Sequence, residues 1–347
     1  MTDEPLPAAL SAEINAVLDE AGVRSDRRLV MRMLRTAILL GEDGADRLDL
    51  KIASAALAEM RDAFRLFAPF RGVPKVTVFG SARTRQDDPL YLQARDVAAV
   101  LAQDGWMVVT GAGPGIMQAA AEGAGPERSL GVSIRLPFEE KANGLVAGQD
   151  HVVAMKYFFT RKLMLIKESR GFICLPGGFG TLDEMFELLT LQQTGKAEPM
   201  PIVLLDEPGG TFWQGLRRFI DQELAPAGVI SEGDFDRVVI TDSVDAARDE
   251  ITGFWWNYDS LRWIGDELVL RLRVAPTDAE IDALNEQFAP MLASGRIQRA
   301  EPRQAEVADG DLLELPRLAL QLEQRQVGNL FRLIGAINQL PSAAPAR

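Results

Sequence analysis

The residues whose types and spacing could do chemistry lie between positions 176 and 184. Gly177, Gly178, Gly180 and Thr181 separate an apolar run from a helical pattern. Glycines leave backbone N–H groups uncovered, and the N-terminus of a helix adds partial positive charge. This turn therefore predicts a phosphate site. Because no Gly-Lys-Ser or Gly-Lys-Thr occurs in it, the expected anion is a monophosphate rather than a triphosphate.

Glu184, at the end of this turn, has two possible roles. The spacing from Thr181 to Glu184 fits a capping box, in which the carboxylate only accepts a hydrogen bond from the backbone of Thr181. A carboxylate here could instead stabilise the positive charge that develops on a sugar when a glycosidic bond breaks, or activate the attacking water. The spacing alone leaves both interpretations open.

Arg161 and Lys162 are the second ingredient of a candidate site. They lie on a predicted helix over residues 157–168, which leads directly into the strand before the glycine turn. Two cations on a helix often form only a solvated face. The surrounding residues are mostly apolar, however. Charged residues within an apolar helix indicate a functional role, which is the alternative hypothesis for this pair.

Two more glycine-rich loops follow predicted strands. One contains Gly80 and Ser81, and the other contains Gly111, Gly113 and Gly115. The second loop departs from the dinucleotide fingerprint, because Gly-x-Gly-x-x-Gly would need a glycine at position 116, which is isoleucine. A tight strand-to-helix turn is the alternative interpretation. Ligands of parallel α/β sheets bind outside the carboxyl ends of the strands, where these loops are expected.

Short apolar runs alternate with amphipathic ones through the middle of the chain, which predicts a doubly wound parallel sheet in an α/β domain over residues 73–258. The predicted strands cover 76–79, 107–110, 130–134, 172–175, 202–205 and 238–240. The predicted helices cover 90–103, 116–123, 157–168, 181–193 and 213–224.

The segments on either side of this domain have different hydrophobic patterns. Residues 1–72 predict a helical extension, with an apolar stripe at Leu57, Met60, Phe64 and Phe67 for packing. Residues 259–347 predict a small α+β appendage. Its expected parts are a half-buried strand over 268–274, a helix capped by residues 277–280, a second strand over 318–322, a further helix through 330–334 and a disordered tail after position 340.

Composition limits the classes of function. The formal charge of −13 disfavours nucleic acid and anionic membranes as partners. One cysteine, Cys174, excludes an intrachain disulfide and predicts a cytoplasmic setting, with the thiol buried in a strand. One histidine, His151, argues against a metal site, and a structural place at a strand edge is its expected role. No stretch predicts a membrane span.

The sequence Pro-Gly-Gly-Phe-Gly-Thr-Leu-Asp-Glu at 176–184, together with Arg161 and Lys162, resembles the Lonely Guy-type phosphoribohydrolases, a family often mislabelled as lysine decarboxylases. Val-Phe-Gly-Ser at 78–81 and Thr-Gly-Ala-Gly-Pro-Gly-Ile-Met at 110–117 support the resemblance, which covers residues 75–242. The chain departs from the family pattern in the second loop, where many relatives have three successive glycines. Both extensions also lie outside the family core.

The resemblance implies a Rossmann-like domain that cleaves the N-glycosidic bond of an AMP-like nucleoside 5′-monophosphate to free base and ribose 5-phosphate, without cofactor or metal. It implies a homodimer or higher oligomer with active sites near the interface. Arg161 and Glu184 would be the catalytic pair, with Arg161 holding the phosphate, orienting Glu184 or assisting the base. The implied substrate-binding residues are Gly80, Ser81, Gly111, Gly113, Gly115, Lys162, Gly177, Gly178, Gly180 and Thr181.

Two other classes of function stay open. A non-catalytic nucleotide- or molybdenum-cofactor-binding carrier or regulatory protein could use the same scaffold. The appendages could also make the protein a mainly structural oligomer. Decarboxylation is disfavoured, because no residue pattern suggests a pyridoxal-phosphate lysine with its partners.

Overall fold

The computed structural model describes residues 7–135, 151–230, 234–323 and 327–343. By their internal contacts, the residues form two compact units, Met1–Arg61 and Asp62–Arg347. The predicted division into three parts at 72/73 and 258/259 stays a prediction. No helix in these described ranges is long and apolar enough to cross a membrane.

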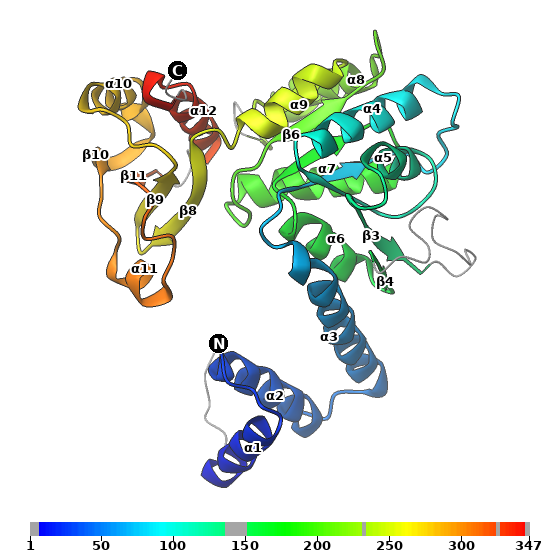
Figure 1. Ribbon diagram of the computed structural model, residues 1–347, viewed down its shortest axis with the longest axis vertical. Coiled ribbons are helices and arrows are strands. Elements are labelled where there is room, and N and C mark those ends of the chain that lie inside the picture. The colour runs from blue at the N-terminus through cyan, green and yellow to red at the C-terminus, as the bar shows by residue number, and fades with distance from the viewer. Residues whose placement is uncertain (1–6, 136–150, 231–233, 324–326, 344–347) are drawn as a thin grey trace. The chain divides into compact units, whose positions relative to one another are not determined.

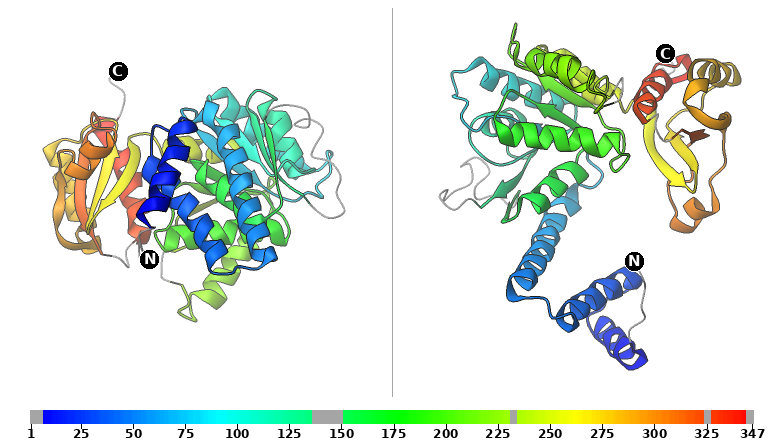
Figure 2. Two further views of the ribbon diagram at one scale, coloured as in Figure 1. Left: turned by 90° about the horizontal axis from the view of Figure 1, so that it is seen from below. Right: turned by 180° about the vertical axis from the view of Figure 1, so that it is seen from behind.

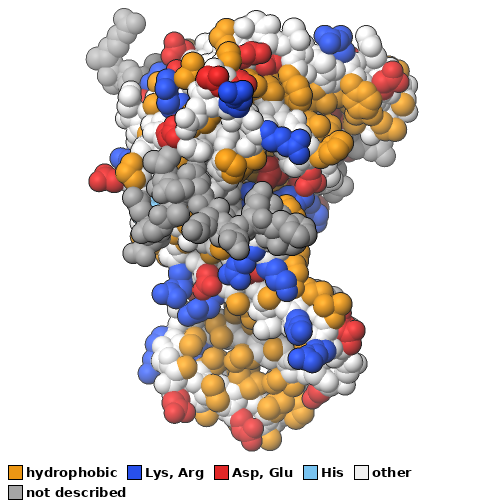
Figure 3. Space-filling view, turned by 90° about the vertical axis from the view of Figure 1, so that its right-hand side faces the viewer, with side chains coloured by type: hydrophobic (Ala, Val, Ile, Leu, Met, Phe, Trp, Pro, Cys, Tyr) orange, Lys and Arg blue, Asp and Glu red, His pale blue; other side chains and the backbone are white. Residues whose placement is uncertain are grey.

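The first unit is helical, as predicted. It contains α1 (Ala8–Glu20), α2 (Arg27–Glu42) and the greater part of α3 (Arg47–Phe67). Ile14 and Leu18 are buried, whereas Leu29 and Met33 on α2 are each 49% exposed. Hydrophobic side chains gather on the face of these helices that Figure 3 shows. The predicted apolar stripe on α3 is only partly buried, because Leu57 and Phe64 are exposed.

A seven-stranded parallel sheet forms the centre of the second unit, in the order β4-β3-β2-β1-β5-β6-β7 (Figure 1). Residues on both faces of its central strands are buried, which explains why these strands appear as continuous apolar runs in the sequence. The strand bounds are β1 (Lys75–Phe79), β2 (Met107–Thr110), β3 (Ser129–Ile134), β4 (Val152–Met155), β5 (Gly171–Cys174), β6 (Ile202–Leu205) and β7 (Val238–Thr241).

Helices cover both faces of this sheet, so the fold is the predicted doubly wound, Rossmann-like α/β type. α4 (Pro89–Gln103), α5 (Ile116–Ala124) and α9 (Val244–Gly253) lie on one face, and α6 (Phe158–Lys167) and α7 (Phe179–Gln193) lie on the other (Figures 1 and 2). The predicted helix at 213–224 is α8 (Phe212–Phe219) continued by a π-helical turn, Ile220–Leu224. β4 was not among the predicted strands.

α6 is fixed to the central strand β1 by a buried polar contact. The Thr77 hydroxyl donates to the Leu165 carbonyl at 3.1 Å and lies 2.6 Å from the hydroxyl oxygen of Ser169. Thr77 is fully buried, so these bonds satisfy a polar group that would otherwise be costly inside the sheet. They also position the helix that carries Arg161.

The C-terminal part is built on an antiparallel sheet in the order β10-β11-β9-β8. Both predicted strands and both predicted helices are present, but β8, β10 and α11 were missed. The elements are β8 (Tyr258–Ile264), β9 (Glu267–Leu272), α10 (Asp278–Phe288), β10 (Leu292–Arg299), α11 (Gln304–Asp309), β11 (Arg317–Leu322) and α12 (Val327–Asn338). The capping box predicted from Thr277 to Glu280 is formed.

The strand predicted over 268–274 is present as β9, but it ends at Leu272, and the prediction that it is half-buried was wrong. Arg271 on β9 is 3% exposed, because its guanidinium and that of Arg317 both bind the fully buried carboxylate of Glu306. Burial alone would raise the pKa of Glu306, but hydrogen bonds from the Arg303 backbone and from Arg271 outweigh it and lower that pKa. An ion triad thus lies where the alternating pattern suggested solvent.

The chain after position 340 was predicted to be disordered, and this is wrong for its first residues. Pro341–Ala343 form a 3₁₀ turn in which Ala343 is buried. The indole N–H of Trp256 donates to the Ala343 carbonyl at 2.9 Å. Residues 344–347 lie outside the described residues.

Candidate active site

The loops after β1, β2 and β5 meet at the carboxyl end of the sheet. β1 lies between β2 and β5, so the strand order reverses at this point, where open α/β sheets bind ligands. A Cβ atom on Gly177 would lie 3.1 Å from the backbone nitrogen of Ser81. The Ile116 N–H donates to the Ser81 carbonyl at 3.0 Å. The structure therefore brings the three predicted loops together.

Several of the predicted glycines are required by this packing. A Cβ on Gly115, whose φ is +67°, would lie 2.3 Å from the Ser81 carbonyl oxygen. One on Gly80 would lie 2.5 Å from the Ile116 side chain, and one on Gly113 would lie 2.6 Å from Met117. Gly80 and Gly115 let two loops approach one another, whereas Gly113 leaves room for Met117 of its own segment. The alternative interpretation as tight turns describes the local role of these glycines.

Gly178 and Gly180 are different. A Cβ at either position would meet no atom of the described residues within 4 Å. Gly178 is the N-cap of α7, and no side chain caps this helix. Open space in front of the uncapped start of a 15-residue helix is the geometry that accepts an anion. Thr181 is buried, in the first turn of the helix.

The capping interpretation of Glu184 is wrong. α7 begins at Phe179, two residues before the predicted start, so Thr181 lies inside the helix and is not its N-cap. Glu184 is then in the second turn, beyond the reach of a capping box. Its carboxylate lies 3.7 Å from Nη1 of Arg161, and the two side chains are 14% and 10% exposed.

Arg161 is held from two sides. Its Nε donates to the Val132 carbonyl on β3 at 2.9 Å, and its Nη2 donates to the Gly111 carbonyl at 3.5 Å. A Cβ on Gly111 would lie 2.0 Å from Nη2, so only glycine leaves room for this guanidinium. Burial lowers the pKa of Arg161, and the charge of Glu184 opposes that shift. Two bonds to the main chain thus aim the third nitrogen at Glu184.

Burial raises the pKa of Glu184 from 4.5 to about 7, although the nearby Arg161 charge lowers it. No described residue donates a hydrogen bond to this carboxylate, and 3.7 Å to Arg161 is longer than a hydrogen bond. Its oxygens therefore remain available as acceptors. A carboxyl with a pKa near neutrality beside a helix start has the properties of an acid–base or charge-stabilising group.

The Lys162 side chain pairs with different residues from those that Arg161 contacts. Its ammonium lies 2.5 Å from Glu187 and 3.2 Å from Asp183, both on α7. Burial alone would lower the pKa of Lys162, but hydrogen bonds to these two carboxylates raise it. The structure therefore places Lys162 in a link between α6 and α7, and its role in substrate binding stays a prediction.

Cys174 and His151 have structural surroundings, as expected. Cys174 is fully buried at the end of β5, and burial raises its pKa well above the ordinary value. The Nδ1 atom of His151 lies 3.2 Å from the Pro126 carbonyl, and its ring makes an edge contact with Phe70. In the described ranges, no group of three or more His, Cys, Asp and Glu side chains could hold a metal ion.

The sequence did not indicate two contributors to this site. The Val132 carbonyl fixes Arg161, but a main-chain acceptor leaves no signal in residue type. Met117 packs where a Cβ on Gly111 or Gly113 would lie. An apolar residue one position into α5 gives no sign of this contact before the loops are placed.

Several known proteins are similar in sequence to this chain. A family model described as "Possible lysine decarboxylase" matches residues 115–251. The chain is 33% identical over 178 residues to a cytokinin riboside 5′-monophosphate phosphoribohydrolase of Mycobacterium tuberculosis, covering 50% of this chain and 91% of that protein. It is 31% identical over 176 residues to the protein of the same name from Mycobacterium marinum, covering 50% and 90%.

Among solved structures, the chain is similar to a molybdenum cofactor binding protein from Rippkaea orientalis. The identity is 22% and the TM-score is 0.35, covering 50% of this chain and 91% of the other. The sequence matches carry more weight, since they span nine tenths of both mycobacterial proteins. The chain belongs to the Lonely Guy-type phosphoribohydrolase family.

Proposed function

We propose that this protein hydrolyses the N-glycosidic bond of a nucleoside 5′-monophosphate, with AMP-like substrates favoured, and releases free base and ribose 5-phosphate. The observation that carries the proposal is the buried Arg161–Glu184 pair, 3.7 Å apart, beside the uncapped start of α7. The names of the mycobacterial relatives support the reaction class.

The 5′-phosphate would bind at the start of α7. Backbone N–H groups at Gly178, Phe179 and Gly180 carry the partial positive charge of the helix terminus, and no side chain among the described residues caps this terminus. This site has no lysine of the kind that holds a terminal phosphate in triphosphatases. It is suited to a monophosphate.

The reaction breaks the bond between C1′ and the base nitrogen, and a water oxygen forms the new bond to C1′. The electron pair of the broken bond leaves with the base, which gains a proton, while the water loses one. Positive charge develops on the sugar, and the Glu184 carboxylate can stabilise it or accept the proton of the water. The charge of Arg161 lowers the pKa of Glu184, so a fraction of the molecules has an ionised Glu184 near neutral pH.

The test is chromatography of the purified protein incubated with single nucleoside monophosphates. We expect free base from at least one of them, and a loss of at least 100-fold in Glu184→Gln. Glu250→Gln is the matched control, because Glu250 is also a carboxyl whose pKa burial raises, but it lies on α9. Its rate should equal that of the wild type.

Two results would reject the proposal. One is the absence of free base from every common monophosphate, and the other is an unchanged rate in Glu184→Gln. Tight binding of an intact nucleotide without turnover, measured by calorimetry, would instead identify a carrier or sensor.

Self-association would involve the surface next to this site. Apolar side chains on α6 and α7 are exposed, and the most exposed is Phe179 at 92%. The others are Phe158, Phe159, Leu163 and Phe186. Such a patch is typical of an interface. Light scattering should give the mass of a dimer or larger assembly, and Phe179→Asp together with Leu163→Asp should reduce that mass. A monomeric wild type would contradict this expectation.

A further inference from the structure

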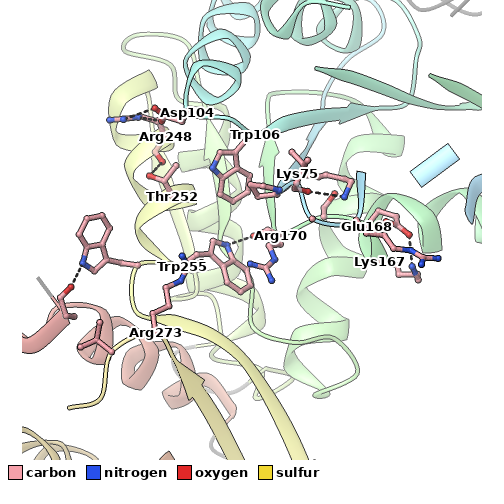
Figure 4. Close-up of a pocket in the computed structure, with 18 of the residues that line it drawn as sticks. Lys75, Asp104, Trp106, Lys167, Glu168, Arg170, Arg248, Thr252, Trp255 and Arg273 are labelled. Carbon is pink, nitrogen blue, oxygen red and sulfur yellow. Dashed lines mark hydrogen bonds and ion pairs between the residues drawn. The ribbon is translucent and has the colours of Figure 1, made fainter. Parts of the chain in front are cut away.

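A second cavity, of about 1160 Å³, lies at the opposite end of the parallel sheet. Lys75 begins β1, Trp106 directly precedes β2 and Arg170 directly precedes β5, and all three line it. Trp255 and Arg273, from the segments before β8 and after β9, form another wall (Figure 4). The strands run from this cavity toward the candidate active site, and a five-residue strand spans roughly 15 Å. The two sites are therefore separate.

The lining of this cavity is strongly cationic in a chain whose net charge is −13. It contains two carboxylates, Asp104 and Glu168, which are already paired with Arg248 at 2.5 Å and Lys167 at 2.6 Å. The cationic side chains number six: Arg71, Lys75, Lys167, Arg170, Arg248 and Arg273. Six cations against two carboxylates leave an excess of four positive charges, which suits an anion carrying more than one negative charge.

Part of this charge has no carboxylate or hydrogen-bond partner among the described residues. Lys75 donates to the carbonyls of Phe70 and Val73 and is thereby satisfied. Arg170 and Arg273, by contrast, make no side-chain hydrogen bond or ion pair with any residue that the structure describes. A guanidinium presents a rigid fork of donors that matches phosphate oxygens. These two side chains are therefore available to an anionic ligand.

The same cavity gathers three of the five tryptophans of the chain. Trp255 is buried, its indole N–H donates to the Arg170 carbonyl at 2.8 Å, and its ring lies 4.8 Å from the Arg170 guanidinium. Trp256 is 52% exposed although its indole N–H is bound to Ala343. An exposed indole held in a fixed orientation offers a face on which a planar ring can stack.

We propose that this cavity binds an aromatic polyanion of the nucleoside diphosphate or triphosphate class. The Arg170 and Arg273 guanidinium groups bind the phosphates, and a tryptophan face stacks on the base. The cavity volume exceeds the range of about 300–1,000 Å³ that is common for small-molecule sites, so a ligand with base, sugar and two or three phosphates can enter. The site is independent of the proposed hydrolysis.

Calorimetry of the full chain with three probes tests the two halves of the proposal. ADP carries ring and charge, pyrophosphate carries charge alone, and adenosine carries the ring alone. We expect ADP to bind at least ten times more tightly than either of the others. In the double variant Arg170→Gln with Arg273→Gln, ADP binding should weaken at least tenfold. Arg296→Gln, an exposed arginine on β10, is the matched control and should bind as the wild type does.

Arg161→Gln separates this cavity from the candidate active site, and ADP binding should persist in that variant. Loss of ADP binding there, persistence in the double variant, or equal binding of pyrophosphate would each overturn the proposal. A second measurement avoids variants altogether. Photo-crosslinking of 8-azido-ADP to the wild type should label peptides containing Trp255 or Trp256, and labelling confined to residues 176–184 would overturn the assignment.

Discussion

Replacement of Glu184 by glutamine tests the electrostatics of the site without any assumption about the substrate. The pKa of this carboxyl is raised from 4.5 to about 7, because the folded protein buries it. A pKa shift of one unit corresponds to about 1.4 kcal/mol of free energy. The shift at Glu184 therefore corresponds to about 3 kcal/mol of pH-dependent unfolding free energy. Glutamine has nearly the same shape and does not titrate, and the variant therefore removes this pH-dependent contribution.

The raised pKa of Glu184 determines whether stability rises or falls with pH. The folded state holds the Glu184 proton more tightly than the unfolded chain, so the group contributes fully to stability below pH 4.5 and loses that contribution as the pH rises through about 7. Relative to Glu184→Gln, the wild type should lose about 2 kcal/mol between pH 5.5 and 8.5. This window avoids the isoelectric point near 4.8.

Urea unfolding of both proteins at several pH values measures this difference. In the variant, Arg161 has lost its charged partner, which changes the free energy of unfolding by a constant amount. That amount does not depend on pH over this range because an arginine stays charged. Glu286→Gln, an exposed carboxylate on α10, controls for the loss of one negative charge. A wild-type-minus-variant difference that stays flat within about 0.5 kcal/mol would refute the raised pKa of Glu184 and the charge argument built on it.

Three further outcomes are expected. The wild-type rate of base release should rise with pH through about 7 as Glu184 loses its proton, and a rate that falls over this range would show that the protonated form acts. Gly111→Ala should lower that rate at least tenfold by displacing Arg161, whereas Gly253→Ala, with no atom of the described residues within 4 Å of the new Cβ, should not. Glu306→Ala should cost about 3–5 kcal/mol in urea unfolding, since two buried arginines lose their shared partner; a cost under about 1 kcal/mol would contradict this.

The sequence predicts the parallel sheet well because its strands are buried on both faces. Runs such as residues 202–205 contain only apolar residues and are fully buried in β6. β10 exposes most of its residues and gives no clear run. β4 is a run of four apolar residues with a mixed burial pattern, and this short run at the edge of the sheet was not predicted as a strand. β8 is intermediate along most of its length. Partial burial blurs the pattern on which strand prediction depends.

The candidate site could be predicted only in part, because its residues come from separate loops. The sequence of the turn after β5 is enough to predict an anion site, and in the structure a Cβ on Gly178 or Gly180 would have no described atom within 4 Å. The proximity of Arg161 to Glu184 depends on the Val132 and Gly111 carbonyls, which no residue type reveals. The orientation of the Lys162 side chain depends on two carboxylates of the next helix, α7. Residue types thus suggest the chemistry, whereas the geometry requires the fold.

The position at which α7 begins connects the two halves of the proposed reaction. With the first residue at Phe179, the open N–H groups lie at the helix start and Glu184 lies five residues later, roughly 7.5 Å along the axis. In a nucleoside 5′-monophosphate, the phosphate and C1′ lie on opposite sides of the sugar. One helix can therefore hold the phosphate at its terminus and place a carboxylate near the reacting carbon. With Thr181 as the N-cap, Glu184 would have been a capping residue; the N-cap is Gly178, so a shift of three residues decides whether this carboxylate can take part in catalysis.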